Sequence, residues 1–310
     1  MRILPLLKGY RAVSVVGTGK GSGKTTTCNY ILAEAQKDRR LGITSFGLGG
    51  TQTPLEIPQN SLIALAKNCE ITKKLELLDE TDAGTPWGSV VIGRAKEDIQ
   101  AIITGPLCLS DLKKIKDRLL SLGCDLVVID SVLDKKSSSS SRVCDCFILS
   151  AGIDFSDRDS MYEEIQSQVE VLSIPVATSL PPSFDKHYAK VQEKWIPFDI
   201  KDIPANLLLE AEEIFWPGAF VGGSVNLIAG WKTSLPVIVE EPWQLFLSTS
   251  AWRNLKRDGW IFKSCFHSPI ALVTLNPCSS SGFSINPREF LIRTSEMLEP
   301  LKVINLKLNE

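Results

Sequence analysis

The stretch VVGTGKGSGKTTTCNY, Val15 to Tyr30, carries the strongest local signal in the sequence. A nucleotide-binding phosphate loop is usually written G-x-x-x-x-G-K-[ST], with the first glycine six positions before the lysine. Here the residue six positions before Lys24 is Thr18, and Gly17 lies one position earlier. The sequence therefore contains either a phosphate loop that is one residue longer than the usual pattern or a glycine-rich turn that resembles one.

The segments on either side of this stretch favour the phosphate loop. Ala12 to Gly17 has the sequence AVSVVG, a β-branched run typical of a strand buried on both faces, and Thr25 to Lys37 has the spacing of a helix. A loop between a strand and a helix offers backbone N–H groups and a helix N-terminus to phosphate oxygens. Four glycines lack the Cβ atoms that would block close approach, and they are Gly17, Gly19, Gly21 and Gly23.

Side chains in the loop and at the start of the helix complete the predicted site. Lys24 is placed to neutralise the β- and γ-phosphates, and the hydroxyl of Thr25 can coordinate Mg²⁺. Lys20 either contacts phosphate or is a solvated loop charge, and the sequence leaves both alternatives open. We therefore expect ATP to bind here with Mg²⁺, although the sequence does not distinguish ATP from GTP.

A phosphate loop also needs an acidic side chain for Mg²⁺ or its bound water, normally at the end of a neighbouring apolar strand. The run LVVID ends at Asp130, which we predict to be this group, with capping of a turn as the alternative. Asp134 is either a second acid that orients water or a solvated loop acid. The predicted catalytic residues are accordingly Lys24, Asp130 and Asp134, and the predicted metal ligands are Thr25 and Asp130.

Other chemistry-bearing residues favour structural roles. Cys144 and Cys146 could ligate a metal, but no second pair follows at zinc-like spacing and an apolar run begins directly after them, so we expect buried cysteines. His187 and His267 are far apart in sequence, and no nucleophile pattern accompanies them. Asn276 follows an apolar run, where its amide either reads a nucleotide base or belongs to an Asn-Pro turn.

Alternating strand and helix patterns predict an α/β fold with a mostly parallel, doubly wound phosphate-loop sheet. We assign residues 1–180 to this nucleotide-binding domain and residues 51–95 to a β-rich insertion within it, with DETDAGTPWG as a turn-rich connection. Residues 181–310 are expected to form a second, smaller α/β lobe for docking and transmission. Ser137 to Ser141 is expected to be a loop that crosses the top of the sheet.

The second lobe is rich in tryptophan. It holds six of the seven tryptophans, namely Trp195, Trp216, Trp231, Trp243, Trp252 and Trp260. Aromatic side chains anchor protein interfaces, so an exposed group of them on one face would give a partner a surface to bind. Packing in the core of the lobe is the alternative that we favour.

The composition is that of an average globular protein. Of the 310 residues 44% are apolar and 23% are charged, and the net charge of -2 gives no electrostatic case for a nucleic-acid or membrane partner. The eight cysteines are scattered within apolar runs, which favours a reduced, cytoplasmic setting over a disulfide framework. The N-terminal segment lacks a signal-peptide cleavage site, and no window has the ~18 apolar residues of a membrane span.

Five segments together support a family resemblance, and they are VVGTGKGSGKTTTCNY, GITSFGL, GTPWGSVVIGRA, LVVIDSVLDKKSSSSSRVCDCFILSAG and ALVTLNPCSSSGFSINPREFL. They resemble the KamB-like P-loop subunit of lysine 5,6-aminomutase reactivases, and they are spread over most of the chain. The longer loop is similar to that of the dethiobiotin synthetase and nitrogenase iron protein class of P-loop proteins. The resemblance implies Asp130 as the residue that serves the metal, and it implies nucleotide binding by Gly17, Gly21, Ser22, Gly23, Lys24, Thr25 and Thr26.

The function that the resemblance implies is that of an Mg²⁺-dependent ATPase working with a MutS-like ATPase subunit. The pair would act on lysine 5,6-aminomutase and drive out damaged cobalamin so that intact adenosylcobalamin enters. A homodimer is compatible with this assignment. Family members carry acidic residues after the second strand, where this chain has GLGGTQ, so Gly49 to Gln52 cannot supply them. A dethiobiotin synthetase-like ligase or kinase and a nucleotide-binding pseudo-enzyme therefore stay as alternatives.

Overall fold

The computed structural model describes residues 2–48, 53–131, 136–153, 158–231, 235–278 and 284–308. The chain forms two compact units, of which the first comprises Met1–Tyr162 with Ser268–Glu310 and the second comprises Glu163–His267. The predicted division at residues 180 and 181 is therefore wrong, because the last segment returns to the first unit. Its apolar run IALVTLN pairs with a strand of that unit, and a sequence pattern alone does not tell which sheet a buried strand joins.

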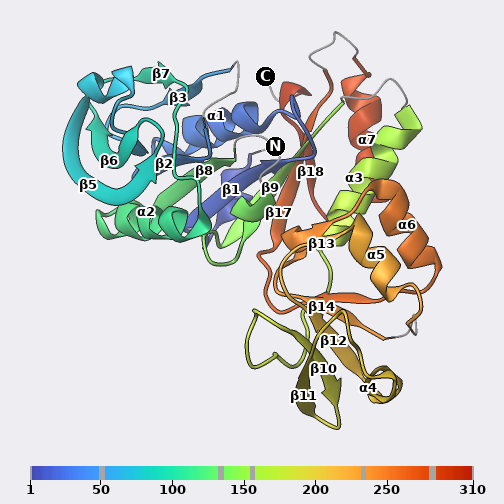
Figure 1. The fold of residues 1–310 in the computed structure, drawn as a ribbon. Coiled ribbons are helices and arrows are strands. Elements are labelled where there is room, and N and C mark those ends of the chain that lie inside the picture. The colour runs from blue at the N-terminus through green and yellow to red at the C-terminus, as the bar shows by residue number, and fades with distance from the viewer. Residues whose placement is uncertain are drawn as a thin grey trace. The chain divides into compact units, whose positions relative to one another are not determined.

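The first unit is built on a nine-stranded sheet with the order β18-β17-β9-β1-β8-β2-β4-β6-β5. The strands from β18 to β4 run parallel, and β6 and β5 are antiparallel additions at one edge. β1 lies between β9 and β8, so the loop after β1 lies where the carboxyl ends of three parallel strands meet (Figure 1). The bounds of these strands are β1 (Ala12–Gly17), β2 (Leu41–Phe46), β4 (Leu62–Ala66), β5 (Leu75–Thr85), β6 (Gly88–Ala95), β8 (Leu126–Ser131), β9 (Cys146–Gly152), β17 (Ile270–Asn276) and β18 (Val303–Asn305).

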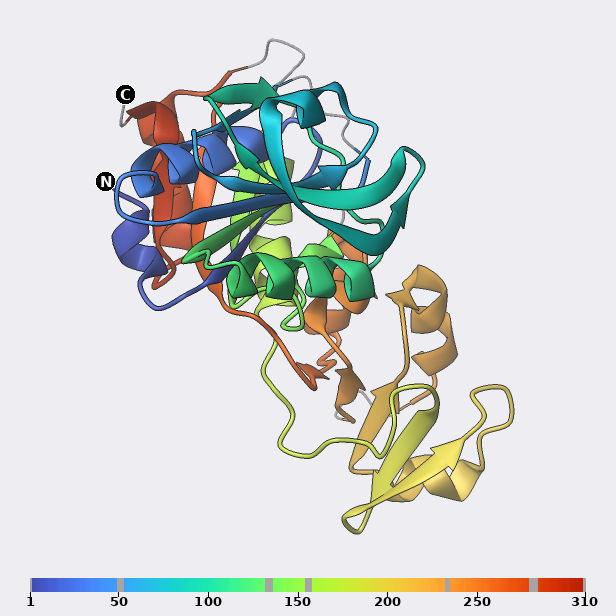
Figure 2. The ribbon, with the colours of Figure 1, turned by 90° about the vertical axis from the view of Figure 1, so that its left-hand side faces the viewer.

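Helices cover both faces of this sheet because successive strand residues point to opposite sides and nearly all are apolar. Val15 of β1 shares one core with Ile31 of α1, and Ile129 of β8 shares the other core with Ile115 of α2. Figure 2 shows the blue helix α1 and the green helix α2 on opposite sides of the strands. The predicted α/β fold with a large, mostly parallel sheet is confirmed. The helices with residues in this unit are α1 (Lys24–Ala35), α2 (Leu109–Ser121), α3 (Arg158–Leu172) and α7 (Pro287–Met297), with short 3-10 turns η1 (Leu4–Leu7), η2 (Glu70–Lys74) and η5 (Leu306–Leu308).

The segment predicted as a β-rich insertion at 51–95 is β-rich in its described part, and its strands β4, β6 and β5 extend the main sheet. β4 pairs in parallel with β2, and β6 pairs with β4 in the antiparallel sense. The stretch DETDAGTPWG is mostly strand, since β5 runs to Thr85 and β6 begins at Gly88. Its acidic residues suit β5 because an edge strand exposes one side to solvent. A separate two-stranded ribbon consists of β3 (Leu55–Ile57) and β7 (Ile99–Ala101).

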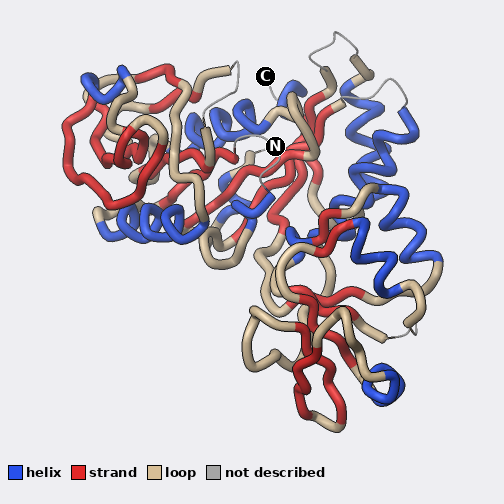
Figure 3. Tube along the Cα trace, viewed as in Figure 1, coloured by secondary structure: helices blue, strands red, loops and turns tan. Residues whose placement is uncertain are grey.

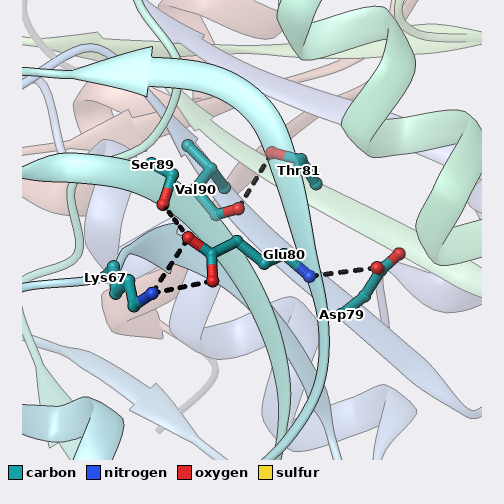
Figure 4. A network of polar contacts seen from close by, with 6 residues as sticks. All are labelled: Lys67, Asp79, Glu80, Thr81, Ser89 and Val90. Atoms are coloured by element: carbon teal, nitrogen blue, oxygen red, sulfur yellow. Dashed lines mark hydrogen bonds and ion pairs between the residues drawn. The ribbon is translucent and has the colours of Figure 1, made fainter.

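Polar contacts hold the β5–β6 hairpin together (Figure 4). The carboxylate of Glu80 accepts hydrogen bonds from Lys67 Nζ at 2.7 and 3.0 Å and from Ser89 Oγ at 2.6 Å. On the same strand, Thr81 Oγ1 donates to the carbonyl of Val90 at 2.9 Å. The hydrogen bond from Lys67 is the main cause of a lowered pKa of Glu80, and the Ser89 hydroxyl adds to it. The hairpin is thus fixed by side chains that remain in contact with solvent.

The serine run at residues 137–141 is not a loop across the top of the sheet. It begins in η3 (Lys136–Ser139), and Ser138, Ser139 and Ser140 are buried. Ser14 of β1 donates from its hydroxyl to Ser138 Oγ at 2.9 Å. Small hydroxyl side chains can lie against a buried strand when each finds a hydrogen-bond partner, and this explains why a polar run occupies an interior position.

The second unit has its own five-stranded sheet with the order β11-β10-β12-β14-β16 (Figure 3). β12, β14 and β16 run parallel, and β10 and β11 are antiparallel to their neighbours. The strands of this unit are β10 (His187–Val191), β11 (Lys194–Phe198), β12 (Glu213–Trp216), β13 (Phe220–Val221), β14 (Val237–Val239), β15 (Leu245–Phe246) and β16 (Phe262–Ser264), and its short helices are α4 (Ala205–Glu210), α5 (Gly222–Ile228), α6 (Thr249–Arg257) and the 3-10 turn η4 (Pro242–Gln244). Within the described residues of either unit, no helix combines the length and apolar character that crossing a membrane requires.

None of the six tryptophans of the second unit has an exposed side chain. Trp216, Trp252 and Trp260 are buried, and the other three are half-buried. Trp216 packs edge-on against Phe220 with ring centroids 5.0 Å apart, and Trp252 lies 5.6 Å from Phe262. Core packing is therefore confirmed for Trp216, Trp252 and Trp260, and none of the six has the exposed ring that the docking alternative requires.

Candidate functional site

The glycine-rich loop between β1 and α1 has a backbone that only glycine adopts easily at two positions. Gly21 has φ 74°, and Gly23, which caps α1, has φ 93° and ψ 19°. Side chains with a Cβ atom disfavour this left-handed region. The sequence GSG therefore fixes how the chain turns from the loop into the first turn of α1.

Close packing explains two further glycines. A Cβ atom on Gly17 would lie 2.2 Å from Ser22 Oγ and 2.9 Å from Lys24 Nζ, so the loop folds back over the end of β1. A Cβ atom on Gly152, at the end of β9, would lie 2.4 Å from Ser22 Cα. A Cβ atom on Gly19 would meet nothing within 4 Å. An alanine at position 17 would therefore require the Ser22 and Lys24 side chains to move, whereas an alanine at position 19 would meet open space.

The two helix-start residues singled out in the sequence are both buried. Lys24 is 6% exposed, and its Nζ donates a hydrogen bond across the loop to the carbonyl of Gly19 at 3.1 Å. Thr25 is 5% exposed at the same end of α1. Lys20 and Thr26, by contrast, have exposed side chains, and exposure of Lys20 is compatible with both of its alternatives. A buried lysine inside a loop at a helix N-terminus concentrates positive charge there.

Asp130 lies at the carboxyl end of β8, in register with Val15 of β1. Its side chain is 4% exposed, and Oδ1 has no hydrogen-bond partner within the described residues. Burial raises its pKa from 3.8 to about 6, while the charge of Lys24 and a hydrogen bond with the Cys28 thiol act in the opposite direction. Burial is also the main cause of the strongly raised pKa of the Cys28 thiol, and the carboxylate of Asp130 adds to it.

The structure therefore brings Lys24 and Asp130 close enough for their charges to interact. A buried carboxylate with an unsatisfied oxygen is costly unless a ligand, ion or water completes it. The residues that Asp130 would cap directly follow β8 at 132–135 and lie outside the described residues, so the capping alternative stays a prediction. Among the described residues its polar contact is with Cys28.

Ser45 is a member of this region that sequence reasoning missed. It lies on β2 in register with Asp130, so both side chains point to the α1 face of the sheet. Ser45 is 0% exposed, and its Oγ has no hydrogen-bond partner in the part of the chain that the structure describes. Ser22 Oγ in the loop is likewise buried without a partner there. A serine inside an apolar strand was the available signal, but a single hydroxyl in a strand is too common to single out.

Two more residues that hold the loop come from distant parts of the chain. Ser150 Oγ on β9 donates to the carbonyl of Ser22 at 2.8 Å, and Asn276 Nδ2 on β17 donates to the carbonyl of Gly21 at 2.8 Å. Thr18 N also donates to the carbonyl of Ser150 at 3.0 Å. The base-reading alternative for Asn276 does not describe its contacts here, since its amide is engaged by the loop.

The remaining candidates that the structure describes do not join this site. Cys144 and Cys146 are buried, and the carboxylate of Asp145 between them accepts hydrogen bonds from the backbone N–H groups of Arg11 and Ala12 at 2.7 and 2.9 Å. All eight cysteines lie among the described residues and are free thiols. His187 packs 4.8 Å from Trp216, and burial lowers its pKa. Asp134 and Gly49 to Gln52 lie outside the described residues.

This arrangement suits an anion together with a small, hard cation. The loop and the N-terminus of α1 attract negative charge, and Lys24 supplies a positive charge beside them. Mg²⁺ prefers oxygen ligands, and the hydroxyl of Thr25 with the unsatisfied Oδ1 of Asp130 are donors of that kind. In the described ranges, no group of three or more His, Cys, Asp and Glu side chains offers a separate metal site.

Comparison with known proteins adds little to this picture. No protein-family model matches the sequence, and no curated protein matches it. Among solved structures, the chimerical protein CapA2B2 is similar over 51% of this chain and 70% of its own, with 14% sequence identity and a TM-score of 0.25. A similarity at that level carries no argument about fold or function.

Proposed function

We propose that this protein binds and hydrolyses ATP as a P-loop ATPase that requires Mg²⁺. The observation that carries the proposal is the juxtaposition of Lys24, at the N-terminus of α1, with the buried, incompletely bonded carboxylate of Asp130. A turn with only a structural role would not require a lysine and an acid to be buried together near the carboxyl ends of parallel strands, because burying charged groups is costly. Perturbed ionisable groups of this kind cluster at functional sites.

Binding of the phosphates rests on the loop and on Lys24. The N–H groups of the loop and of the first turn of α1 would donate to phosphate oxygens. Lys24 would give up its hydrogen bond to the carbonyl of Gly19 and donate to a phosphate oxygen instead. Thr25 and Asp130 are the residues that would hold Mg²⁺. The metal would neutralise charge on the phosphates. Among this chain's own residues the contribution is thus positioning and charge neutralisation, without a covalent intermediate.

The proposed cellular role follows from the resemblance of the sequence. It is that of a reactivase subunit that acts with a MutS-like ATPase on lysine 5,6-aminomutase and exchanges damaged cobalamin. A ligase or kinase would need a pocket for a second substrate beside the loop. The cavity between α1 and the β3–β7 ribbon contains Asn29, Glu56 and Asp98 but no loop residue, so it does not favour that alternative.

Calorimetric titration of the full chain with Mg²⁺-ATP and Mg²⁺-ADP tests the proposal. Lys24→Ala should abolish binding, whereas Lys20→Ala, a matched control at an exposed position of the same loop, should bind within about twofold of wild type. Unchanged affinity in Lys24→Ala would show that the loop is only a structural turn. Asp130→Asn should keep ADP affinity within about tenfold, about 1.4 kcal/mol, while its ATPase rate falls much further. If wild type binds ATP but shows no turnover, the pseudo-enzyme alternative is correct.

A further inference from the structure

Two side chains from neighbouring strands hold the carbonyl groups of consecutive loop residues. Asn276 Nδ2 donates to the carbonyl of Gly21, and Ser150 Oγ donates to the carbonyl of Ser22, each at 2.8 Å. The strands β17 and β9 that carry them pair in parallel and lie side by side in Figure 1. The two donors therefore approach the loop from the same part of the sheet.

The direction of each of these carbonyl groups also fixes the direction of the N–H group that follows it. A trans peptide is planar, so the C=O of one residue and the N–H of the next point in opposite directions. Because the carbonyls of Gly21 and Ser22 point toward β17 and β9, the N–H groups of Ser22 and Gly23 point away from these strands. Within the described residues neither N–H group has an acceptor. Both are therefore available to a ligand.

A third group in the loop points to the same ligand. Ser22 Oγ is buried without a partner in the described part of the chain, and it lies beside Lys24 Nζ over Gly17. Two N–H groups and a hydroxyl without partners among the described residues, together with an ammonium group, form a donor-rich site. A phosphate group would satisfy all of them at once.

Further contacts hold Ser150 and Asn276 in position. Thr27 Oγ1 on α1 lies 2.8 Å from Thr274 Oγ1 on β17 and 3.4 Å from Ser150 Oγ. A Cβ atom on Gly23 would lie 3.0 Å from Asn276 Cβ, so the loop packs directly against this asparagine. The hydroxyl groups thus form a buried contact between the strands and α1, and the half-buried amide of Asn276 lies beside it against the loop.

We propose that Asn276 and Ser150 are positioning residues that preorganise the loop to bind a polyphosphate, and that Asn276 does not recognise the base. The inference rests on the proposed function, since it concerns the same loop. It adds two residues that affect phosphate binding without contacting the phosphates themselves. One of them, Asn276, lies 255 residues from Gly21 along the chain. It also predicts that their effect is the same for any ligand with the same phosphates.

The test measures the Kd of Mg²⁺-ATP, Mg²⁺-GTP and Mg²⁺-tripolyphosphate by calorimetry for wild type, Asn276→Ala and Ser150→Ala. Each substitution removes one hydrogen bond that orients the loop, so each should weaken every ligand that binds wild type by the same factor, about tenfold. The ratio of ATP to tripolyphosphate affinity should stay at its wild-type value. Asn254→Ala, at an exposed position on α6 of the second unit, serves as the matched control and should bind as wild type.

Three results would count against the inference or its basis. If Asn276→Ala loses affinity for ATP but keeps its affinity for tripolyphosphate, the amide reads the base and the inference is wrong. If both variants bind all ligands as wild type does, while Lys24→Ala does not bind, the proposed function stands and only the positioning role fails. If wild type binds none of the three, the proposed function itself fails. The unfolding temperature of each ligand-free variant is measured alongside, and because two independent variants are used, instability of one leaves the other decisive.

Discussion

Replacing Asp130 by asparagine should stabilise the ligand-free protein at neutral pH. Asp130 is almost fully buried, and burial raises its pKa from 3.8 to about 6. The folded state therefore holds the proton more tightly than the unfolded state does. The stability that this carboxyl group contributes is fully present below about pH 4 and is lost as the pH rises through about 6. Asparagine has nearly the same shape but no charge to bury.

The magnitude follows from the size of the pKa difference. A difference of about two units corresponds to about 3 kcal/mol, since each unit is worth about 1.4 kcal/mol. The stability of Asp130→Asn relative to wild type should therefore increase by about 3 kcal/mol between pH 4 and pH 7. For a unit of about 200 residues, this corresponds to a rise of roughly 6 to 12 °C in the unfolding midpoint.

The assay is thermal unfolding of both proteins in buffer free of nucleotide and divalent metal, between pH 4.5 and 7.5. Asp125→Asn provides a matched contrast, because hydrogen bonds from the Arg40 side chain lower the pKa of that exposed carboxyl group. Its stabilising effect is present at neutral pH and is lost as the pH falls through its lowered pKa, so its substitution should act in the opposite direction. An Asp130→Asn midpoint at or below that of wild type at pH 7.5, or a difference that does not change with pH, would refute the reasoning.

Three further predictions concern the loop, the units and the hairpin. Gly17→Ala should weaken Mg²⁺-ATP binding strongly, because its Cβ atom would lie 2.2 Å from Ser22 Oγ. Gly19→Ala has open space around its Cβ atom and should bind within about twofold of wild type. Titration of both variants checks this, and equal losses of affinity would contradict it. A fragment of residues 163–267 should unfold cooperatively when followed by tryptophan fluorescence. A fragment of residues 181–310 should bind a hydrophobic dye, because its strands β17 and β18 would lack their neighbour β9. The reverse outcome would contradict the division into units. Glu80→Gln should lower the unfolding midpoint only slightly, because it removes an exposed ion pair between Lys67 and Glu80. The effect should be present only above the lowered pKa of Glu80, since the pair is lost as the pH falls through that pKa. A decrease in the midpoint that is equally large at pH 3 would show that it does not come from the Lys67–Glu80 pair.

Local patterns in the sequence sufficed for the strand, loop and helix around Lys24. They also sufficed for Asp130, because a single apolar run fixes both the strand and the position of the acid at its end. The same patterns identified the segment at 51–95 as β-rich, but they did not show that β4, β6 and β5 continue the main sheet, since such patterns do not tell which strand edges pair. β17 and β18 were placed in the wrong unit for the same reason.

The parts of the site that were missed depend on long-range contacts. Ser150 and Asn276 reach the loop from 128 and 255 residues away in the chain, and no local period records such a pairing. Ser45 joins the site only because β2 and β8 are in register. From the sequence, Gly17 is explained by close approach of the ligand, whereas the structure shows that the side chains of Ser22 and Lys24 also lie against it.

The central claim is that the glycine-rich loop and Asp130 form one site for a nucleotide and Mg²⁺. The most direct measurement is equilibrium titration of wild-type protein with ATP, with and without Mg²⁺, beside the same titrations of Asp130→Asn. The account predicts saturable binding of one ATP per chain that Mg²⁺ strengthens in wild type and strengthens much less in the variant. Absence of saturable binding at millimolar ATP, or an equal effect of Mg²⁺ on both proteins, would contradict it.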